Sequence, residues 1–119
     1  MQIKLFDSEF KVMDILWREG DLTAKRLTKL LGEQVGWNKN TTYSVIKKCI
    51  NKGVIERLEP NFLCCALIQK EQVQEHETAE LINKVFDGSA NLLFASLLNR
   101  KKLSADEIEN LKQIVNSLE

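Results

Sequence analysis

The sequence predicts a mainly α-helical protein with one β-hairpin near its middle. Five Gly and one Pro in 119 residues supply too few turns for an all-β protein. Apolar residues recur at helical spacing in the stretches before residue 53 and again in those after residue 69. Between these stretches the spacing changes to two, which is typical of β-strands and places a hairpin over residues 54–68.

Three short helices are expected before the hairpin. Asp7 or Ser8 is placed to cap the first helix, and Gly20 suits the position just past its end. Thr23 is expected to cap a second helix over about residues 24–34, and Asn38 a third over about residues 39–52. The inward face of the third helix is predicted to consist of Thr42, Val45, Ile46, Cys49 and Ile50.

After Gly53 the sequence predicts two strands joined by a tight turn. Residues 54–58 form the first strand, residues 59–61 the turn and residues 62–68 the second strand. Three helices followed by a hairpin are the element order of a winged helix-turn-helix domain. The third helix is then the recognition helix, which enters the major groove of DNA, and the hairpin is the wing.

The outward face of the third helix has the chemistry of a DNA-reading surface. It carries hydrogen-bonding side chains near its start, lysines in its middle and no acidic residue. Asn, Thr, Ser and Tyr donate and accept hydrogen bonds at base edges, whereas wing residues reach the phosphate backbone, which positions the protein. The residues expected to contact double-stranded DNA are Lys39, Asn40, Thr41, Tyr43, Ser44, Lys47, Lys48, Arg57 and Asn61.

The distribution of charge supports this hypothesis, although the formal net charge is zero. Residues 20–57 hold 8 Lys and Arg against 3 Asp and Glu, whereas residues 71–119 hold 5 against 9. A basic first part with an acidic second part is one way to build a nucleic-acid-binding protein of neutral isoelectric point. The alternative function is a winged-helix module that docks another protein.

The second part of the chain is predicted to be a helical dimerisation region. Helices are expected over residues 70–86, over about residues 90–100 and after Ser104, which forms a capping box with Glu107. Residues 89–119 contain more apolar side chains than helices of this length bury alone, which favours a two-fold homodimer. The residues expected at the dimer interface are Leu92, Leu93, Phe94, Leu97, Leu98, Ile108, Leu111, Ile114 and Val115.

These expectations divide the chain into a winged-helix DNA-binding domain over residues 1–70 and a helical dimerisation region over residues 71–119. The division falls between the predicted wing and the long charged helix that follows it. A two-fold dimer presents two recognition helices, which matches a palindromic operator.

Ordered motifs run along nearly the whole chain. They are EFKVMDILW at residues 9–17, WNKNT at 37–41, KGVI at 52–55, Gly88, and LSADEIENL at 103–111. Together they resemble the BlaI/MecI family of penicillinase repressors, which includes copper-responsive CopY-type members. The resemblance implies a homodimeric transcriptional repressor that binds dyad operators upstream of resistance or stress genes. Many family members are inactivated when a membrane-bound sensor metalloprotease triggers their cleavage within the dimerisation region.

The resemblance also implies roles for single residues. Thr41, Tyr43 and Ser44 fall where the family reads bases, although Tyr43 replaces a frequent arginine of the family. The family's scissile Asn-Phe pair corresponds to Ser96 and Leu97, which form the possible cleavage site. The C-terminal cysteine cluster of CopY-type members is absent, because no cysteine follows residue 65.

The cysteines and the histidine show no pattern of a metal site or an enzyme. Cys49, Cys64 and Cys65 are expected to be reduced thiols, and the last two point to opposite faces of a strand. A further alternative keeps DNA binding but makes the inducing signal a small ligand or oxidation of the more exposed of these two thiols. His76 is the only histidine of the sequence and lies in a charged helix, so we expect no metal, no cofactor and no catalytic site.

Two features of the sequence bear on its location. No stretch approaches the roughly 20 apolar residues of a membrane span. The N-terminal sequence MQIKLFDSEF lacks the basic start and apolar block of a signal peptide. We therefore expect a cytoplasmic protein without membrane insertion.

Overall fold

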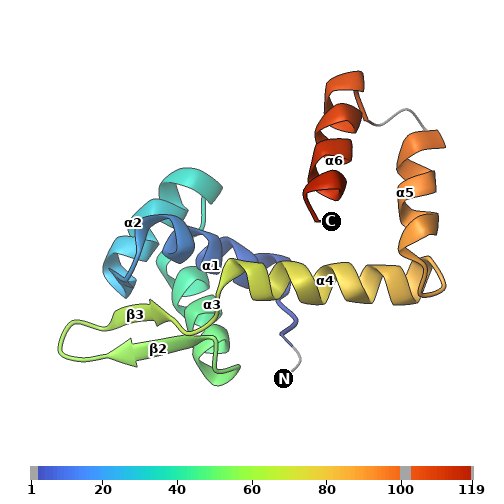
Figure 1. Ribbon diagram of the computed structural model, residues 1–119. Coiled ribbons are helices and arrows are strands. Elements are labelled where there is room, and N and C mark those ends of the chain that lie inside the picture. Colours follow the sequence, from blue (N-terminus) through green and yellow to red (C-terminus); the bar gives the residue numbers. More distant parts are fainter. Residues whose placement is uncertain (1–2, 100–102, 119) are drawn as a thin grey trace. The chain divides into compact units, whose positions relative to one another are not determined.

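Helices, a small sheet and further helices follow one another in the computed structural model, which describes residues 3–99 and 103–118 (Figure 1). The elements are α1 (Asp7–Glu19), β1 (Leu22–Thr23), α2 (Ala24–Val35), α3 (Lys39–Asn51), β2 (Ile55–Leu58), β3 (Leu63–Ala66), α4 (Lys70–Val85), α5 (Ala90–Asn99) and α6 (Ala105–Ser117). The predicted fold class, a winged-helix domain followed by a helical region, is confirmed. The predicted end of the fifth helix, residue 100, lies outside the described residues.

The described residues form two compact units. The first unit ends at Glu77 and the second begins at Thr78, so α4 contributes residues to both. The predicted domain division after residue 70 stays a prediction.

Polar side chains cap several helices where the sequence predicts them. Thr23 Oγ1 accepts a hydrogen bond from the backbone N–H of Arg26 at 3.1 Å, which caps α2. Asn38 Oδ1 accepts one from the N–H of Thr41 at 2.8 Å, which caps α3. The capping box predicted at Ser104 is present at the start of α6.

The first helix begins differently from the prediction. α1 starts at Asp7 and its N-cap is Phe6, so the prediction that Asp7 or Ser8 caps it is wrong. The carboxylate of Glu9 takes over part of the role of a cap, because its Oε1 accepts a hydrogen bond from the Phe6 N–H at 2.8 Å. An acidic residue in the first turn thus allows an apolar residue at the N-cap.

The sheet contains a strand that the sequence pattern does not predict. β3 lies in the middle and pairs antiparallel with both β2 and β1, while the two hairpin strands are shorter than predicted. β1 places Leu22 opposite Cys64, and its 2 residues are too few to show a period. The N–H of Ala24 donates to the carbonyl of Phe62 at 2.9 Å, which ties the start of α2 to the turn of the hairpin.

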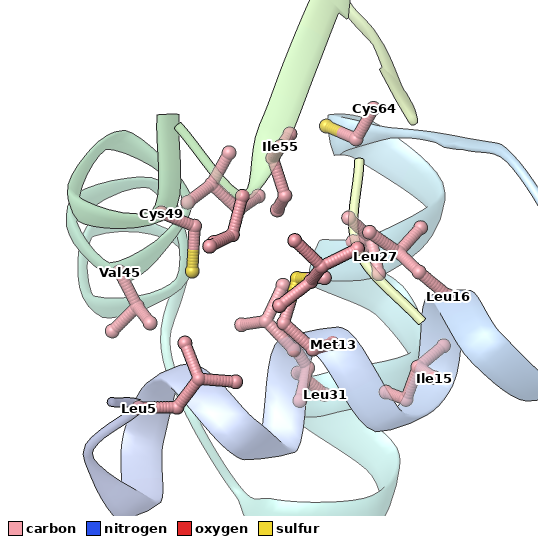
Figure 2. Packing of buried hydrophobic residues seen from close by; sticks show 14 of the residues in the cluster. Leu5, Met13, Ile15, Leu16, Leu27, Leu31, Val45, Cys49, Ile55 and Cys64 are labelled. Atoms are coloured by element: carbon pink, nitrogen blue, oxygen red, sulfur yellow. The ribbon is translucent and has the colours of Figure 1, made fainter. Parts of the chain in front are cut away.

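The core of the first unit lies between α1, α2, α3 and the inner face of the sheet (Figure 2). Met13 of α1, Leu27 of α2 and Ile55 of β2 are fully buried in it. The predicted inward face of α3 is confirmed, since Thr42, Val45, Ile46 and Cys49 are buried and Ile50 is half-buried. Burial of each large apolar side chain contributes about 1.5–3 kcal/mol, so these contacts dominate the stability of the unit.

An ion pair between a buried carboxylate and a partly exposed lysine joins the start of α1 to the residue that follows α3. Glu9 is 1% exposed, and its Oε1 lies 2.6 Å from Nζ of Lys52. The same ammonium group donates to the backbone carbonyl of Lys4 at 2.8 Å and lies 4.5 Å from the ring centroid of Phe6. The carboxylate therefore has two donors, Lys52 and the Phe6 N–H, which compensate for its removal from water.

The start of α4 is fastened to α1. Trp17 Nε1–H donates to the carbonyl of Ile68 at 3.0 Å, just before α4 begins. Lys70 Nζ lies 3.2 Å from Asp14 Oδ1, and Val73 is buried. These contacts hold the chain against α1 at the point where it leaves the hairpin.

The second unit has no buried side chain among its described residues, 78–99 and 103–118. Its large exposed apolar residues are Leu81, Val85, Leu92, Phe94, Leu98, Ile114, Val115 and Leu118. None of the helices that the structure describes is long and apolar enough to cross a membrane. The apolar side chains that the sequence places in this region thus lie largely on the surface of the single chain.

We predict that Lys52→Met lowers the free energy of unfolding by about 3 kcal/mol, because it leaves the Glu9 carboxylate buried without its cation. Urea denaturation followed by tryptophan fluorescence measures the change, since Trp17 and Trp37 both lie in the first unit. Lys48→Met is the matched control, because Lys48 is exposed on α3 and its loss should change stability by less than about 0.5 kcal/mol. Equal losses in the two variants would show that the ion pair does not stabilise the fold.

Candidate nucleic-acid interface

The N-terminal half of α3 presents polar side chains to solvent. Asn40, Thr41 and Ser44 are exposed, because the buried face of the helix turns them away from the core. The backbone N–H of Thr41 is bound by the Asn38 cap, so its hydroxyl is the group that a ligand meets. Base edges in a major groove are read by donors and acceptors of this kind.

Lysines accompany these polar groups along α3. Lys39 lies in the first turn, and Lys47 and Lys48 lie in the second half of the helix. All three are exposed, and α3 contains no acidic residue. The N-terminal end of a helix carries a partial positive charge, which no acid in the first turn of α3 offsets. The face is therefore electropositive along its length, as a surface that binds phosphates requires.

A second basic cluster, which the prediction omitted, lies on α2. Lys25, Arg26 and Lys29 are exposed, and α2 has no acidic residue in its first turn. Cations near the N-terminus of a helix oppose its dipole, so this placement is unfavourable for the helix alone. A phosphate bound at this end of the helix would compensate for it. The cap Thr23, followed after Ala24 by Lys25 and Arg26, is the signal in the sequence that marks this cluster.

The wing contacts α3 through two rings that lie between two cations. The rings of Tyr43 and Phe62 meet edge to face, with centroids 5.7 Å apart and planes at 81°. Lys39 Nζ lies 5.8 Å from the Tyr43 centroid, and Arg57 Cζ lies 3.7 Å from the Phe62 centroid. We call these four residues the wing column. It links the recognition helix to the hairpin of Figure 1.

The predicted DNA-contacting residues lie in different environments. Those on α3 are exposed apart from Tyr43, which is half-buried against Phe62. The guanidinium of Arg57 stacks on Phe62 and forms an ion pair with Glu59. Asn61 is exposed in the turn of the wing. Phe62 and Glu59 were absent from the prediction because their contacts depend on how the turn folds, which no residue spacing reveals.

The cysteines lie in or beside the core. Cys49 and Cys64 are buried and Cys65 is half-buried, which confirms that the adjacent pair faces opposite sides. Burial raises the pKa of Cys49 to about 12 and that of Cys64 to about 11. The pKa of Cys65 is also raised. Partial burial is the largest cause, and a hydrogen bond with Asp21 is the next. The three thiols are therefore protonated at neutral pH, which disfavours redox sensing.

The described residues offer no site for a metal ion. Within residues 3–99 and 103–118, no group of three His, Cys, Asp or Glu side chains is arranged to hold one. The chemistry available at the recognition helix is thus that of hydrogen bonds, positive charge and stacked rings.

A helix-turn-helix with a lysine-bearing, acid-free recognition face and an adjoining wing defines a winged-helix DNA-binding protein. Comparison with known proteins gives its family. The family model described as "Penicillinase repressor" matches residues 5–117. The chain therefore belongs to the penicillinase repressor family, whose members are DNA-binding transcriptional repressors and not enzymes.

Individual relatives match much of the chain. The methicillin resistance regulatory protein MecI of Staphylococcus aureus is 29% identical over 115 residues, which cover 95% of this chain and 94% of MecI. The solution structure of the DNA-binding domain of the repressor BlaI has a TM-score of 0.55 at 19% identity, over 59% of this chain and 88% of that one. The monomeric form of Bacillus licheniformis BlaI, in complex with the blaP half-operator, has a TM-score of 0.52 at 19% identity, over 60% of this chain and 89% of that one. The two structures support the winged-helix fold.

We predict that the thiol reagent dithiobis(nitrobenzoic acid) modifies Cys65 slowly in the folded protein at neutral pH. It should not modify Cys49 or Cys64. The thiolate is the reacting form, and raised pKa values leave little of it, so the rate at Cys65 increases as the pH rises. The absorbance of the released chromophore measures the number and rate of reacting thiols, and Cys65→Ser should remove the slow signal. Fast modification of Cys65 at neutral pH would contradict this prediction and favour redox control.

Proposed function

We propose that this protein is a homodimeric repressor that binds a palindromic operator and controls resistance genes in the cytoplasm. The proposal depends on the exposed face of α3, which combines hydrogen-bonding side chains with lysines and carries no acid. Membership of the penicillinase repressor family supports it. The relative MecI, which is described as a methicillin resistance regulatory protein, supports a role in resistance.

Two kinds of contact act together on the operator. Hydrogen bonds to base edges select the sequence, whereas contacts to phosphates supply affinity and its dependence on salt. The base-reading residues are Asn40, Thr41, Tyr43 and Ser44, and the residues that bind the backbone are Lys39, Lys47, Lys48, Arg57 and Asn61. Tyr43 fits its role because the contact with Phe62 fixes the direction of its ring before DNA binds.

A second copy of the chain covers the apolar surface of the second unit. Of the proposed interface residues, Leu92, Phe94, Leu98, Ile114 and Val115 are exposed in the single chain, and Leu93, Leu97, Ile108 and Leu111 are half-buried. An apolar surface that is exposed to water is unfavourable unless another surface covers it. In a two-fold dimer, the same residues of the second copy cover it. The BlaI complex with a half-operator supports an operator of two half-sites, one for each protomer.

Proteolysis within α5 is the proposed way in which repression is relieved. Ser96 and Leu97 are half-buried in the second half of this helix. A protease cleaves a locally opened segment, and a helix without buried residues opens more easily than one in a core. Cleavage there separates residues of the proposed dimer interface, and a membrane-bound sensor protease pathway is the proposed partner.

We predict that Lys47→Ala and Lys48→Ala weaken binding to operator and random DNA alike, and that each lowers the salt slope by about 0.9. Ser44→Ala should weaken binding to the operator alone, by about 1–3 kcal/mol, because it removes a base contact. Fluorescence anisotropy measures both effects with the protein's own upstream DNA and a scrambled duplex. Lys84→Ala, in α4, controls for the loss of one charge. Wild-type binding by every α3 variant would show that the recognition helix is wrongly assigned.

We predict that Leu98→Glu converts the dimer to a monomer at micromolar concentration, because it places an unpaired charge in an apolar interface. Sedimentation equilibrium measures the mass, and circular dichroism checks that the helices remain. Leu58→Glu is the matched control, since Leu58 is a similarly exposed leucine of the wing, 42% against 50% for Leu98. A wild-type chain that sediments as a monomer at the same concentration would refute the dimer.

A further inference from the structure

The face of the hairpin that packs on the core extends past the core along β2. In β2, Ile55 is buried, and Arg57 lies two residues later on the same face, opposite the buried Cys64 of β3. Glu56 lies between them on the other face, opposite the half-buried Cys65. Arg57 therefore extends the side of the wing that meets the recognition helix, whereas Glu56 belongs to the opposite side.

The guanidinium of Arg57 has two partners within the chain. Its Cζ lies 3.7 Å from the ring centroid of Phe62, which in turn contacts Tyr43. Its Nε forms an ion pair with Oε1 of Glu59, the first residue after β2. The two charged side chains are 48% and 59% exposed, so a ligand in solution can reach the pair.

Phe62 forms a fixed platform for this guanidinium. Its carbonyl accepts the N–H of Ala24 at 2.9 Å, and its ring packs edge to face with Tyr43. Stacking uses the flat face of a guanidinium, while ion pairing uses its N–H edge. Arg57 can therefore exchange its ionic partner without leaving the ring of Phe62.

We propose that Glu59 is an internal competitor that holds Arg57 away from DNA phosphate and so lowers the affinity of this repressor for DNA. A guanidinium binds carboxylates and phosphates through the same N–H groups. Because Glu59 occupies Nε and offsets the charge of the guanidinium, an Arg57–phosphate contact reaches its full strength only after the Arg57–Glu59 pair breaks. The effect is independent of base sequence, because phosphates carry no sequence information. This inference rests on the proposed function, in which Arg57 contacts the DNA backbone.

Simple repulsion between an acid and DNA also weakens binding, and Glu56 separates the two effects. Glu56 is an exposed acid on the same strand as Arg57, but it lies on the other face of the hairpin and outside the wing column. Repulsion acts through Glu56 and Glu59 alike, with or without Arg57. Competition acts through Glu59 alone, and only while Arg57 is present.

The test is a double-mutant cycle of Glu59→Gln and Arg57→Gln, with Glu56→Gln as the control of equal charge. Each variant is titrated against a labelled duplex of random sequence at several salt concentrations, and fluorescence anisotropy reports binding. Glu59→Gln should tighten binding about three- to fivefold, the scale of one half-exposed ion pair, with an unchanged salt slope. Glu56→Gln should change binding by less than about twofold.

The Arg57→Gln variant completes the cycle. Alone, it should weaken binding and lower the salt slope by about 0.9, for one lost phosphate contact. In its background, Glu59→Gln should have only the small effect of Glu56→Gln. An equal gain from Glu59→Gln with and without Arg57, or a gain no larger than that of Glu56→Gln, would overturn the competition while leaving the wing contact intact. No effect of Arg57→Gln on affinity or slope would overturn the wing contact itself, and the competition with it.

Discussion

The buried carboxylate of Glu9 is the constraint on which the arrangement of the first unit depends. It binds the N–H of Phe6 and the ammonium group of Lys52, so it closes the start of α1 and fixes the end of α3 at one point. Apolar contacts in the core hold the helices together but are non-directional. The ion pair fixes the orientation of the recognition helix at one end, and the contact of Tyr43 with Phe62 fixes it near the other end. A helix held at both ends presents its side chains in one orientation, which base reading requires.

The two units differ in where their large apolar side chains lie. The first closes over its own core, whereas the second leaves its large apolar side chains on the surface of the chain. On the proposed dimer, the stability of the second unit therefore depends on protein concentration, while the DNA-reading unit keeps its own core. A signal that weakens association then separates two intact DNA-binding units, each of which keeps a single half-site contact. Loss of repression in this scheme requires no unfolding of the part that reads DNA.

Local signals in the sequence predicted most of this architecture. The caps Thr23 and Asn38 and the capping box of α6 each bind an N–H only three residues away, so a short window of sequence contains the whole interaction. The features that escaped prediction depend on distant partners or on short segments. Phe6 can serve as the N-cap of α1 because Glu9 is held by Lys52, 43 positions further along the chain. The strand β1 is too short to show a period. The exposed face of α3 follows from helical spacing, but the ion pair of Arg57 depends on the folded turn of the wing.

Phe62 connects several elements through a single residue. Its carbonyl binds the start of α2, its ring meets Tyr43 of α3, and its face supports Arg57 of β2. If Tyr43 reads a base as proposed, a change at residue 43 therefore also affects the wing and α2 through Phe62. An arginine at that position would add a third cation between Lys39 and Arg57. The wing turn would then have to change as well, so we expect positions 43 and 62 to diverge as a pair when repressors of this family evolve new operators.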